Sequence, residues 1–498
     1  MKVLFPVSEC EPFAKTGGLG DVGSALPNEL VKKDIDIRVI LPFYRKVQDY
    51  LTDHPEIPYK KIMADREVSF EKFYHGMKKL YTFNVFQSYL PNNPKVIIYF
   101  IDIPEFFDRE NLYVDEKGNV FPDSAEMFAY FSKAVFEFLN SFNWFPDIIH
   151  CHDWHTGLIP LFIKYGLVNI KQSVKTIFSI HNIAYQGSFP KLFAEKFGFT
   201  NNTLLMNDLL HNEKINFLKA GIISSDIIST VSETYRDELL TSEYGYGLED
   251  VLEKKKDNFI GILNGVDYEA WDPSKDNLIA SKYAPNDLEG KYICKKVLWD
   301  LIKKNNKNFV LKDQSIPIFA MVSRLDRQKG VDLVAQAIPE LKNLDIHVIV
   351  VGSGNKKLEA LLVEQSNLPY FTLIRGFSNE LAHQVESGAD FFIMPSKYEP
   401  CGLNQMYSLK YGTFPIVRKT GGLADTVIDL TDEVNGNGFV FDEYSGEELT
   451  KAIVRAVNFY NSTEKAKIEK MRSKIMEKNF SWEESVKKYV KLYQHDKV

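Results

Sequence analysis

The chain has 498 residues, more than one hydrophobic core holds, because single cores stop growing near roughly 250–300 residues. The net charge of −7 argues against nucleic acid as the main partner, and no stretch approaches the roughly 18 uninterrupted apolar residues of a membrane-spanning helix. The four cysteines are scattered without a C-x-x-C pair, which argues against a zinc site or a disulfide framework and suits a reducing compartment.

Short β-rich runs alternate with helical patterns in the first half of the chain. The first run, Met1–Val7, is too short for the core of a signal peptide and acidic residues follow it, so we expect a cytoplasmic location. A helix is expected near residues 22–33. Further strand candidates are Ile35–Leu41, Val96–Phe100, Ile148–Cys151, Thr176–Ile180 and Ile227–Val231. Continuous apolar strands between helices indicate a parallel, doubly wound sheet.

A long helix is expected to begin at Asp123. Asp123 has the position of an N-cap, and Glu126 three residues later completes the pattern of a capping box. Apolar residues then recur at helical spacing, namely Phe128, Phe131, Val135, Phe138 and Phe142.

The pattern restarts after Lys254–Asp257. A helix is expected at Val331–Leu341, and the strand candidates are Pro317–Val322, His347–Val351, Phe391–Met394, Phe414–Val417 and Gly438–Phe441. We therefore predict two Rossmann-like halves that meet near residue 258. Ligands of such sheets bind beyond the carboxyl ends of the strands, so an interdomain cleft is expected.

A glycine-rich turn, KTGGLGD at residues 15–21, lies between the first strand and the first helix. Glycines there let backbone N–H groups approach an anion, and Lys15 adds a cation. The alternative is a plain turn with a solvated lysine. The motif is neither a Walker loop nor G-x-G-x-x-G, so an NTPase or a dinucleotide site is not indicated.

The sequence SRLDRQKG at residues 323–330 follows a strand of the second half. Arg324 and Lys329 are suited to clamp a diphosphate, the arginine by a two-pronged contact and the lysine as a point charge. The alternative is a solvated charged loop. Gly352 also follows a strand, although tight connections often need glycine for geometry alone.

The sequence EPCGL at residues 399–403 follows strand Phe391–Met394 and precedes a helix. Glu399 is well placed to bind a sugar hydroxyl, and its alternative role is to cap the helix. Cys401 fits a small packing residue better than a nucleophile.

Three histidines, His150, His152 and His155, lie close together around the end of another strand. Their spacing fits no common zinc motif, and Asp153 is the nearby carboxylate, so a structural role is favoured over a metal site. Candidate residues thus follow four different strand ends, which favours a binding site.

Seven motifs together resemble the signatures of bacterial glycogen synthases and plant starch synthases. They are KTGGLGD at 15–21, HDWHTGL at 152–158, HNIAYQG at 181–187, LNGVD at 263–267, SRLDRQKG at 323–330, EPCGLNQMYSLKYG at 399–412 and TGGLADTV at 420–427. The tail, KNFSWEESVKKYVKLY at 478–493, is also similar to theirs. The resemblance spans nearly the whole chain, and the motifs stand in family order.

The resemblance implies an α/β enzyme of the GT-B fold, with two Rossmann-like parallel-sheet domains facing across a cleft. The domains would be residues 1–257 on the acceptor side and 258–477 on the donor side, with a C-terminal helix at 478–498 crossing back to the first. It implies a retaining hexosyltransferase that moves glucose from ADP-glucose to the non-reducing end of an α-1,4-glucan. It implies no metal and no cofactor, and neither nucleic acid nor membrane as a partner.

By matching motif position, the resemblance implies catalytic roles for His155, Arg324, Lys329 and Glu399. The main-chain carbonyl of His155 would support positive charge at the anomeric carbon, and Glu399 would hold glucose hydroxyls. Phe377 would stack on the nucleotide base. The other donor-binding residues would be Lys15, Gly17, Gly18, Asn264, Gly352, Cys401, Gly402 and Leu403.

Two positions bear on the assignment. Asn404 stands where the family usually has threonine, and asparagine still donates a hydrogen bond. Tyr407 stands eight residues after Glu399, where transferases of related fold often carry a second glutamate; tyrosine matches the bacterial and plant type.

Three alternatives stay open. One is a GT-B transferase that uses a UDP-sugar or another acceptor, and a second is a nucleotide-sugar epimerase of similar fold. A third, of a different class, is a non-catalytic glucan-binding scaffold.

Overall fold

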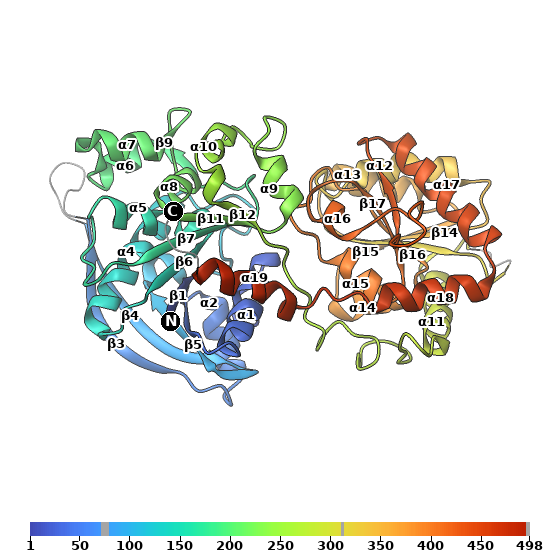
Figure 1. The fold of residues 1–498 in the computed structure, drawn as a ribbon, viewed down its shortest axis with the longest axis horizontal. Helices are drawn as coiled ribbons and strands as arrows, with labels where there is room; N and C mark the ends of the chain where they lie inside the picture. The colour runs from blue at the N-terminus through green and yellow to red at the C-terminus, as the bar shows by residue number, and fades with distance from the viewer. Residues whose placement is uncertain (71–78, 310–312, 495–498) are drawn as a thin grey trace. The chain divides into compact units, whose positions relative to one another are not determined.

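A computed structural model describes residues 1–70, 79–309 and 313–494 of the chain. They form two compact units. The first comprises residues 1–231 and 236–262 and the chain from Ser485 onward, and the second comprises residues 232–235 and 263–484 (Figure 1). Each unit has its own sheet. None of the helices in the described residues combines the length and the apolarity needed to cross a membrane.

The first unit is built on a sheet of nine strands among the described residues, in the order β12-β11-β7-β6-β1-β2-β5-β4-β3. The strands are β1 (Lys2–Pro6), β2 (Asp36–Pro42), β3 (Lys60–Ser69), β4 (Leu80–Leu90), β5 (Asn93–Asp102), β6 (Ile148–His152), β7 (Lys175–Ile180), β11 (Ile227–Thr230) and β12 (Phe259–Gly261). From β12 to β5 the neighbours are parallel, as predicted. β4 is antiparallel to β5 and β3, an addition that the sequence did not predict.

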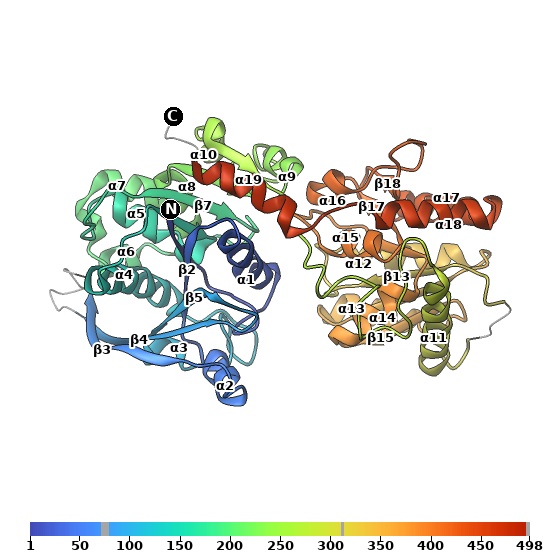
Figure 2. The ribbon, with the colours of Figure 1, turned by 60° about the horizontal axis from the view of Figure 1, so that its bottom comes forward.

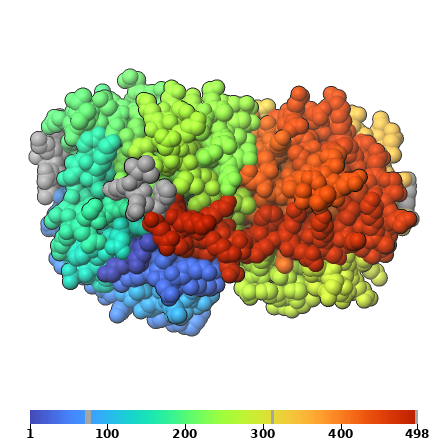
Figure 3. All heavy atoms as spheres, viewed as in Figure 1, coloured from blue at the N-terminus to red at the C-terminus, as the bar shows by residue number. Residues whose placement is uncertain are grey.

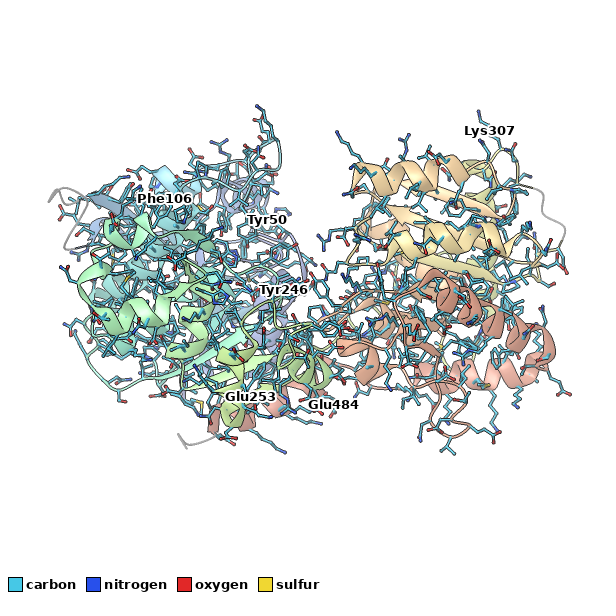
Figure 4. The ribbon with its side chains drawn as sticks, turned by 90° about the horizontal axis from the view of Figure 1, so that it is seen from above. Tyr50, Phe106, Tyr246, Glu253, Lys307 and Glu484 are labelled. Carbon is cyan, nitrogen blue, oxygen red and sulfur yellow. The ribbon has the colours of Figure 1, made fainter. Side chains whose placement is uncertain are left out.

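Helices and a small sheet surround these strands. The helices are α1 (Gly18–Val31), α2 (Arg45–Asp53), α3 (Pro104–Phe107), α4 (Ser124–Phe142), α5 (Leu158–Lys164), α6 (Leu192–Lys196), α7 (Thr203–Leu209), α8 (Phe217–Ser224), α9 (Glu233–Leu239) and α10 (Glu249–Glu253). The small sheet pairs β8 (Ser188–Pro190) and β9 (Leu210–His211) with β10 (Lys214–Asn216). Tyr246, labelled in Figure 4, lies in the loop before α10.

Two local predictions in this unit were wrong. Helix α1 begins at Gly18 rather than near residue 22, so the glycine-rich motif forms its first turn. The side chain of Asp123 stands at the N-cap of α4 but makes no capping hydrogen bond. Its carboxylate instead accepts hydrogen bonds from Arg109, at 2.8 and 2.5 Å. The guanidinium thus replaces the backbone N–H groups that a capping box would bond.

The second unit has six parallel strands in the order β15-β14-β13-β16-β17-β18, counted over its described residues. They are β13 (Ile318–Val322), β14 (His347–Gly352), β15 (Phe371–Arg375), β16 (Phe391–Met394), β17 (Phe414–Arg418) and β18 (Phe439–Phe441). Apolar clusters cover both faces of this sheet, which is why its strands are almost uninterrupted apolar runs.

Eight helices flank this sheet within the described residues. They are α11 (Glu289–Asn305), α12 (Val331–Ala337), α13 (Lys356–Gln365), α14 (Asn379–Gly388), α15 (Asn404–Lys410), α16 (Gly421–Thr426), α17 (Gly446–Ser462) and α18 (Lys465–Met476). Lys307, labelled in Figure 4, follows the end of α11. The helix predicted at Val331–Leu341 changes to a 3-10 turn at Ile338, because Pro339 has no N–H to continue the α-helical pattern.

The last helix, α19 (Trp482–Gln494), begins four residues later than the predicted 478. The residues just before it are not helical, and the Phe480 carbonyl accepts a 2.7 Å hydrogen bond from Val266 N. The end of the predicted helix, 495–498, lies outside the described residues. From Ser485 the helix belongs to the first unit, where Tyr493 Oη lies 2.8 Å from His150 Nδ1 (Figures 2 and 3, dark red).

The division between the units differs from the predicted 257/258. Strand β12 pairs in parallel with β11 and therefore completes the first sheet. The first unit accordingly continues to Ile262, and the second resumes at Leu263.

Candidate active site

The carboxyl edge of the second sheet gathers four of the candidate site residues of this unit. Arg324 follows β13, Gly352 ends β14, Phe377 follows β15 and Glu399 follows β16. These four strands are parallel and adjacent in the order β15-β14-β13-β16. Because the carboxyl ends of parallel strands meet at one edge, the four positions share that edge.

Lys329 and Glu399 form the central charged pair of this edge. Their side chains meet at 2.7 Å between Nζ and Oε2, and Ser396 Oγ donates to the same oxygen at 2.9 Å. Glu399 is 4% exposed, so this is a largely desolvated carboxylate. The alternative role of Glu399 as a helix cap is wrong, because no side chain caps α15.

Arg324 and Phe377 are the exposed members of the edge. The Arg324 side chain is 59% exposed and has an ion pair with Asp326 at 3.3 Å. Phe377 is 67% exposed, although a large apolar ring normally favours burial. A guanidinium and an aromatic face are therefore both accessible.

Packing explains two glycines at this edge. A Cβ on Gly352 would lie 2.0 Å from the Ser323 carbonyl oxygen, so the loops after β14 and β13 require a glycine there. Gly330 has a φ of +73°, and a Cβ there would lie 2.1 Å from the Pro395 oxygen. The close approach at Gly330 holds the loop of Lys329 against the end of β16.

The loop 399–403 is held by its neighbours. Gly422 N donates to the Glu399 carbonyl at 3.1 Å, and a Cβ on Gly422 would lie 1.9 Å from the Cys401 carbonyl oxygen. This close contact explains why the TGGLADTV motif has a glycine at position 422. Gly402 adopts a φ of +70°. Burial raises the pKa of the Cys401 thiol to about 12, so it stays protonated and fits a packing role.

Asn264 and Asn404 border this loop. The backbone N–H of Asn264 lowers the pKa of the Cys401 thiol against the larger effect of burial, which raises it. The buried Oδ1 of Asn264 has no partner among the described residues. Asn404 Nδ2 donates to the Val322 carbonyl at 3.0 Å, which ties α15 to the end of β13. Leu403 is the N-cap residue of α15.

The glycine-rich segment of the first unit follows β1. Lys15 is held between Glu11 and Asp21, at 2.8 and 2.6 Å, so it is an ion-paired lysine rather than a freely solvated one. A Cβ on Gly17 or Gly18 would meet no described atom within 4 Å. Packing therefore does not require these two glycines, and the space beside their backbone is open.

Glu9 organises this segment, and our sequence analysis missed that role. Its buried carboxylate accepts hydrogen bonds from Thr16 N at 2.6 Å, Thr16 Oγ1 at 2.6 Å and Gly17 N at 3.0 Å. Tyr113 Oη donates to it at 2.9 Å. The N–H groups of Thr16 and Gly17 therefore already donate to an anion, the Glu9 carboxylate. An acidic residue just after a strand was the available signal.

His155 is a buried neutral imidazole. Its ring stacks on Trp154 with centroids 4.0 Å apart and lies 4.7 Å from Tyr113. Burial lowers the pKa of His155 to about 3, so the ring carries no charge near neutral pH. His150 and His152 are also buried, and the latter lies 3.0 Å from His181.

No cluster of three or more His, Cys, Asp or Glu side chains in the described ranges is arranged to hold a metal ion. His150 and His152 pack against the ring of Phe5, and His155 packs against Trp154.

The two halves of the chain match two known protein families. Residues 2–254 match the starch synthase catalytic domain family, and residues 302–473 match the glycosyl transferases group 1 family. The chain is 40% identical to a glycogen synthase of Thermodesulfovibrio yellowstonii, over 99% of this chain and 97% of that protein. It is 41% identical to a glycogen synthase of Geotalea daltonii, over 99% and 98%. The chain belongs to the glycogen and starch synthase family.

Solved structures agree with this membership. The catalytic domain of starch synthase IV from Arabidopsis thaliana, bound to ADP and acarbose, has a TM-score of 0.84 and 31% identity, and covers 99% of this chain and 98% of that one. Sucrose-phosphate synthase from Thermosynechococcus elongatus is similar in fold, with a TM-score of 0.60 and 15% identity over 99% and 98% of the chains. The predicted GT-B fold and the assignment as a glycosyltransferase are confirmed.

Proposed function

We propose that this glycosyltransferase moves glucose from ADP-glucose to the non-reducing end of an α-1,4-glucan, with retention of the α-configuration and without a metal ion. The observation that carries the proposal is the Lys329–Glu399 pair, a cation and a carboxylate joined at one sheet edge. The starch synthase IV structure, bound to ADP and acarbose, supports an ADP-linked donor and a glucan-like acceptor.

Arg324 and Lys329 would neutralise the departing diphosphate. As the bond from glucose to ADP breaks, negative charge grows on the leaving group, and fixed cations aimed at developing charge are usually the largest catalytic contribution. The exposed guanidinium of Arg324 suits two-pronged contact with phosphate oxygens. These two cations would supply the charge that a divalent metal supplies in other transferases.

Glu399 would change partners when the donor binds. In the structure its buried carboxylate is paired with Lys329 and accepts a hydrogen bond from Ser396. A diphosphate that draws Lys329 away leaves this carboxylate free to accept hydrogen bonds from glucose hydroxyls. The pair therefore avoids an isolated buried charge before the donor arrives.

Retention would arise by front-face attack. The leaving phosphate accepts the proton of the acceptor hydroxyl while the new glycosidic bond forms on the same face. A double displacement would need a carboxylate close beneath the anomeric carbon. Glu399 is assigned instead to binding the glucose hydroxyls, so trapping a glucosyl adduct on Glu399 would contradict this route.

The other proposed contacts come from motif position. Phe377 would stack on the base, and Lys15, Gly17 and Gly18 would contact donor phosphates and sugar. The neutral ring of His155 is consistent with a role through its carbonyl rather than as an acid or base. The backbone of Asn264 and of residues 401–403 would border the glucose.

The decisive experiment measures transfer of labelled glucose to glycogen from ADP-glucose and UDP-glucose in parallel, with EDTA and no added metal. Incorporation from ADP-glucose alone supports the donor and the metal-free mechanism together. Incorporation only from UDP-glucose would change the assigned donor to UDP-glucose and leave the proposed transfer reaction unchanged. Glycogen binding without transfer from either donor would replace the proposal with the scaffold alternative.

A further inference from the structure

An aromatic stack of three rings lies behind the loop 399–403 of the second unit. Trp271 is sandwiched between His383, with centroids 3.7 Å apart and planes at 15°, and Tyr407, at 3.9 Å and 3°. His383 lies on α14 and Tyr407 on α15. Trp271 itself belongs to the segment that opens the second unit, so the stack joins three separate parts of the chain.

Charged contacts fix the part of this segment that directly follows Trp271. Asp272 pairs with Lys410 at 3.3 Å, at the end of α15. Asp276 Oδ2 lies 2.7 Å from His383 Nδ1 and accepts a 2.6 Å hydrogen bond from Tyr411 Oη. Asp276 and His383 are both nearly fully buried. The segment is therefore pinned to α14 and α15 through several independent contacts.

Both ends of this arrangement reach the loop 399–403. Tyr407 lies on α15, which begins directly after Leu403. Upstream of Trp271, the backbone N–H of Asn264 acts on the Cys401 thiol inside the loop: burial raises the pKa of this thiol and the N–H lowers it. A shift of the segment against α15 would therefore move Asn264 relative to the backbone of residues 401–403.

We propose that Trp271, stacked between His383 and Tyr407, is a positioning residue that sets Asn264 and the loop 399–403 for the glucose end of the donor. The inference rests on the proposed function and deepens it. It also gives Tyr407 a structural role, because the Tyr407 ring stacks on Trp271 and helps to hold it in place. A misplacement of about 1 Å can cost on the order of 10²-fold in rate, so such a device matters even without substrate contact.

The stack acts on the sugar end and not on the nucleotide end. Within the described residues, the ring of Trp271 contacts the rings of His383, Tyr407 and Tyr411. These ring contacts do not include Arg324, Lys329 or Phe377, the residues proposed to hold the diphosphate and the base. Loss of the stack should therefore weaken the use of ADP-glucose while leaving the binding of ADP itself nearly unchanged. A general loss of structure would weaken both.

The test compares Trp271→Leu with Phe459→Leu in the full chain. Phe459 is also a half-buried aromatic of the second unit. Its ring contacts Phe414 on β17 and Phe439 on β18, the last two strands in the order of the sheet. We expect Trp271→Leu to raise the KM for ADP-glucose by roughly ten-fold and to change the ADP Kd by less than about two-fold. Trp271→Phe, which keeps an aromatic ring in the stack, should restore most of the KM.

Hydrogen exchange on the ligand-free proteins gives a readout that needs no activity. Amides of residues 399–404 should exchange faster in Trp271→Leu than in the wild type, and should be unchanged in Phe459→Leu. Equal exchange in the two variants, or parallel losses of ADP-glucose use and ADP binding, would overturn the proposal. A wild type that transfers no glucose from ADP-glucose would instead contradict the proposed function, and the exchange comparison would still decide the role of Trp271.

Discussion

Replacing Lys329 with methionine separates the structural and the catalytic parts of the charged pair. The substitution keeps a long side chain but removes the ammonium that lies 2.7 Å from Glu399. It leaves a carboxylate of 4% exposure without its cation, with Ser396 as a remaining donor. It also removes one of the two cations proposed to neutralise the leaving diphosphate.

The magnitude follows from burial. Removing one partner of a buried ion pair costs about 3–5 kcal/mol, and the lower end, about 3 kcal/mol, applies because Ser396 still donates. For a unit of this size, that corresponds to a fall in Tm of about 6–12 °C. Loss of a preorganised transition-state contact adds a fall in kcat of about 10²–10³.

Scanning calorimetry and initial rates with ADP-glucose measure the two effects. In the double variant Lys329→Met/Glu399→Gln the unpaired charge is gone, so most of the Tm should return while the rate stays low. The reasoning would be refuted by a Tm unchanged in Lys329→Met. It would also be refuted by recovery of the rate in the double variant, since the lysine would then serve only to pair Glu399.

Three further outcomes are expected. Phe377→Ala should weaken ADP binding by roughly ten-fold in calorimetric titration, because base stacking is worth about 1–3 kcal/mol, and an unchanged Kd would exclude the stacking role. Glu9→Gln should speed hydrogen exchange at Thr16 and Gly17 and lower kcat/KM by roughly ten-fold, since one amide oxygen replaces a charged carboxylate; normal exchange there would contradict this. Burial lowers the pKa of His347 to about 3, so only the unfolded chain takes up its proton below pH ~6.5, and stability is lost as pH falls. Relative to His347→Gln, urea unfolding should show the wild type losing about 2 kcal/mol between pH 7 and pH 5, and a constant difference would refute the shift.

Five of the six strands that the structure describes in the second unit could be predicted, because they are apolar runs with mostly buried side chains. The sequence analysis missed β15, whose last three side chains are half-buried or exposed. His347–Val351 and Phe391–Met394 were identified within one residue of β14 and β16. β3 could not be found this way, because most of its side chains are exposed or half-buried and it has no apolar run. It exists through pairing with β4, a contact that no local pattern encodes.

Local rules failed where a distant residue takes over a local role. Glycine is a poor helix former, so the sequence placed the start of α1 after the glycines, yet Gly18 is its first residue. Glu9, held by Tyr113 from far along the chain, bonds Thr16 and Gly17 and so fixes the entry to α1. The predicted capping box at Asp123 was wrong for the same reason, because the Asp123 carboxylate is hydrogen-bonded to Arg109.

The residues of the second-unit edge could be named from sequence, but their state could not. The sequence places Lys329 and Glu399 after two different strands, and the parallel pairing of β13 with β16 in the structure brings the ends of these strands together. Only the structure shows that they bond each other, and this changes what donor binding has to do.

A diphosphate must compete with a buried carboxylate for the lysine, so part of its binding energy goes into exchanging one ion pair for another. The carboxylate released by that exchange can satisfy sugar hydroxyls, which a nucleoside diphosphate alone lacks. A donor that carries its sugar should therefore gain more from this site than free ADP does, because it alone replaces both halves of the pair.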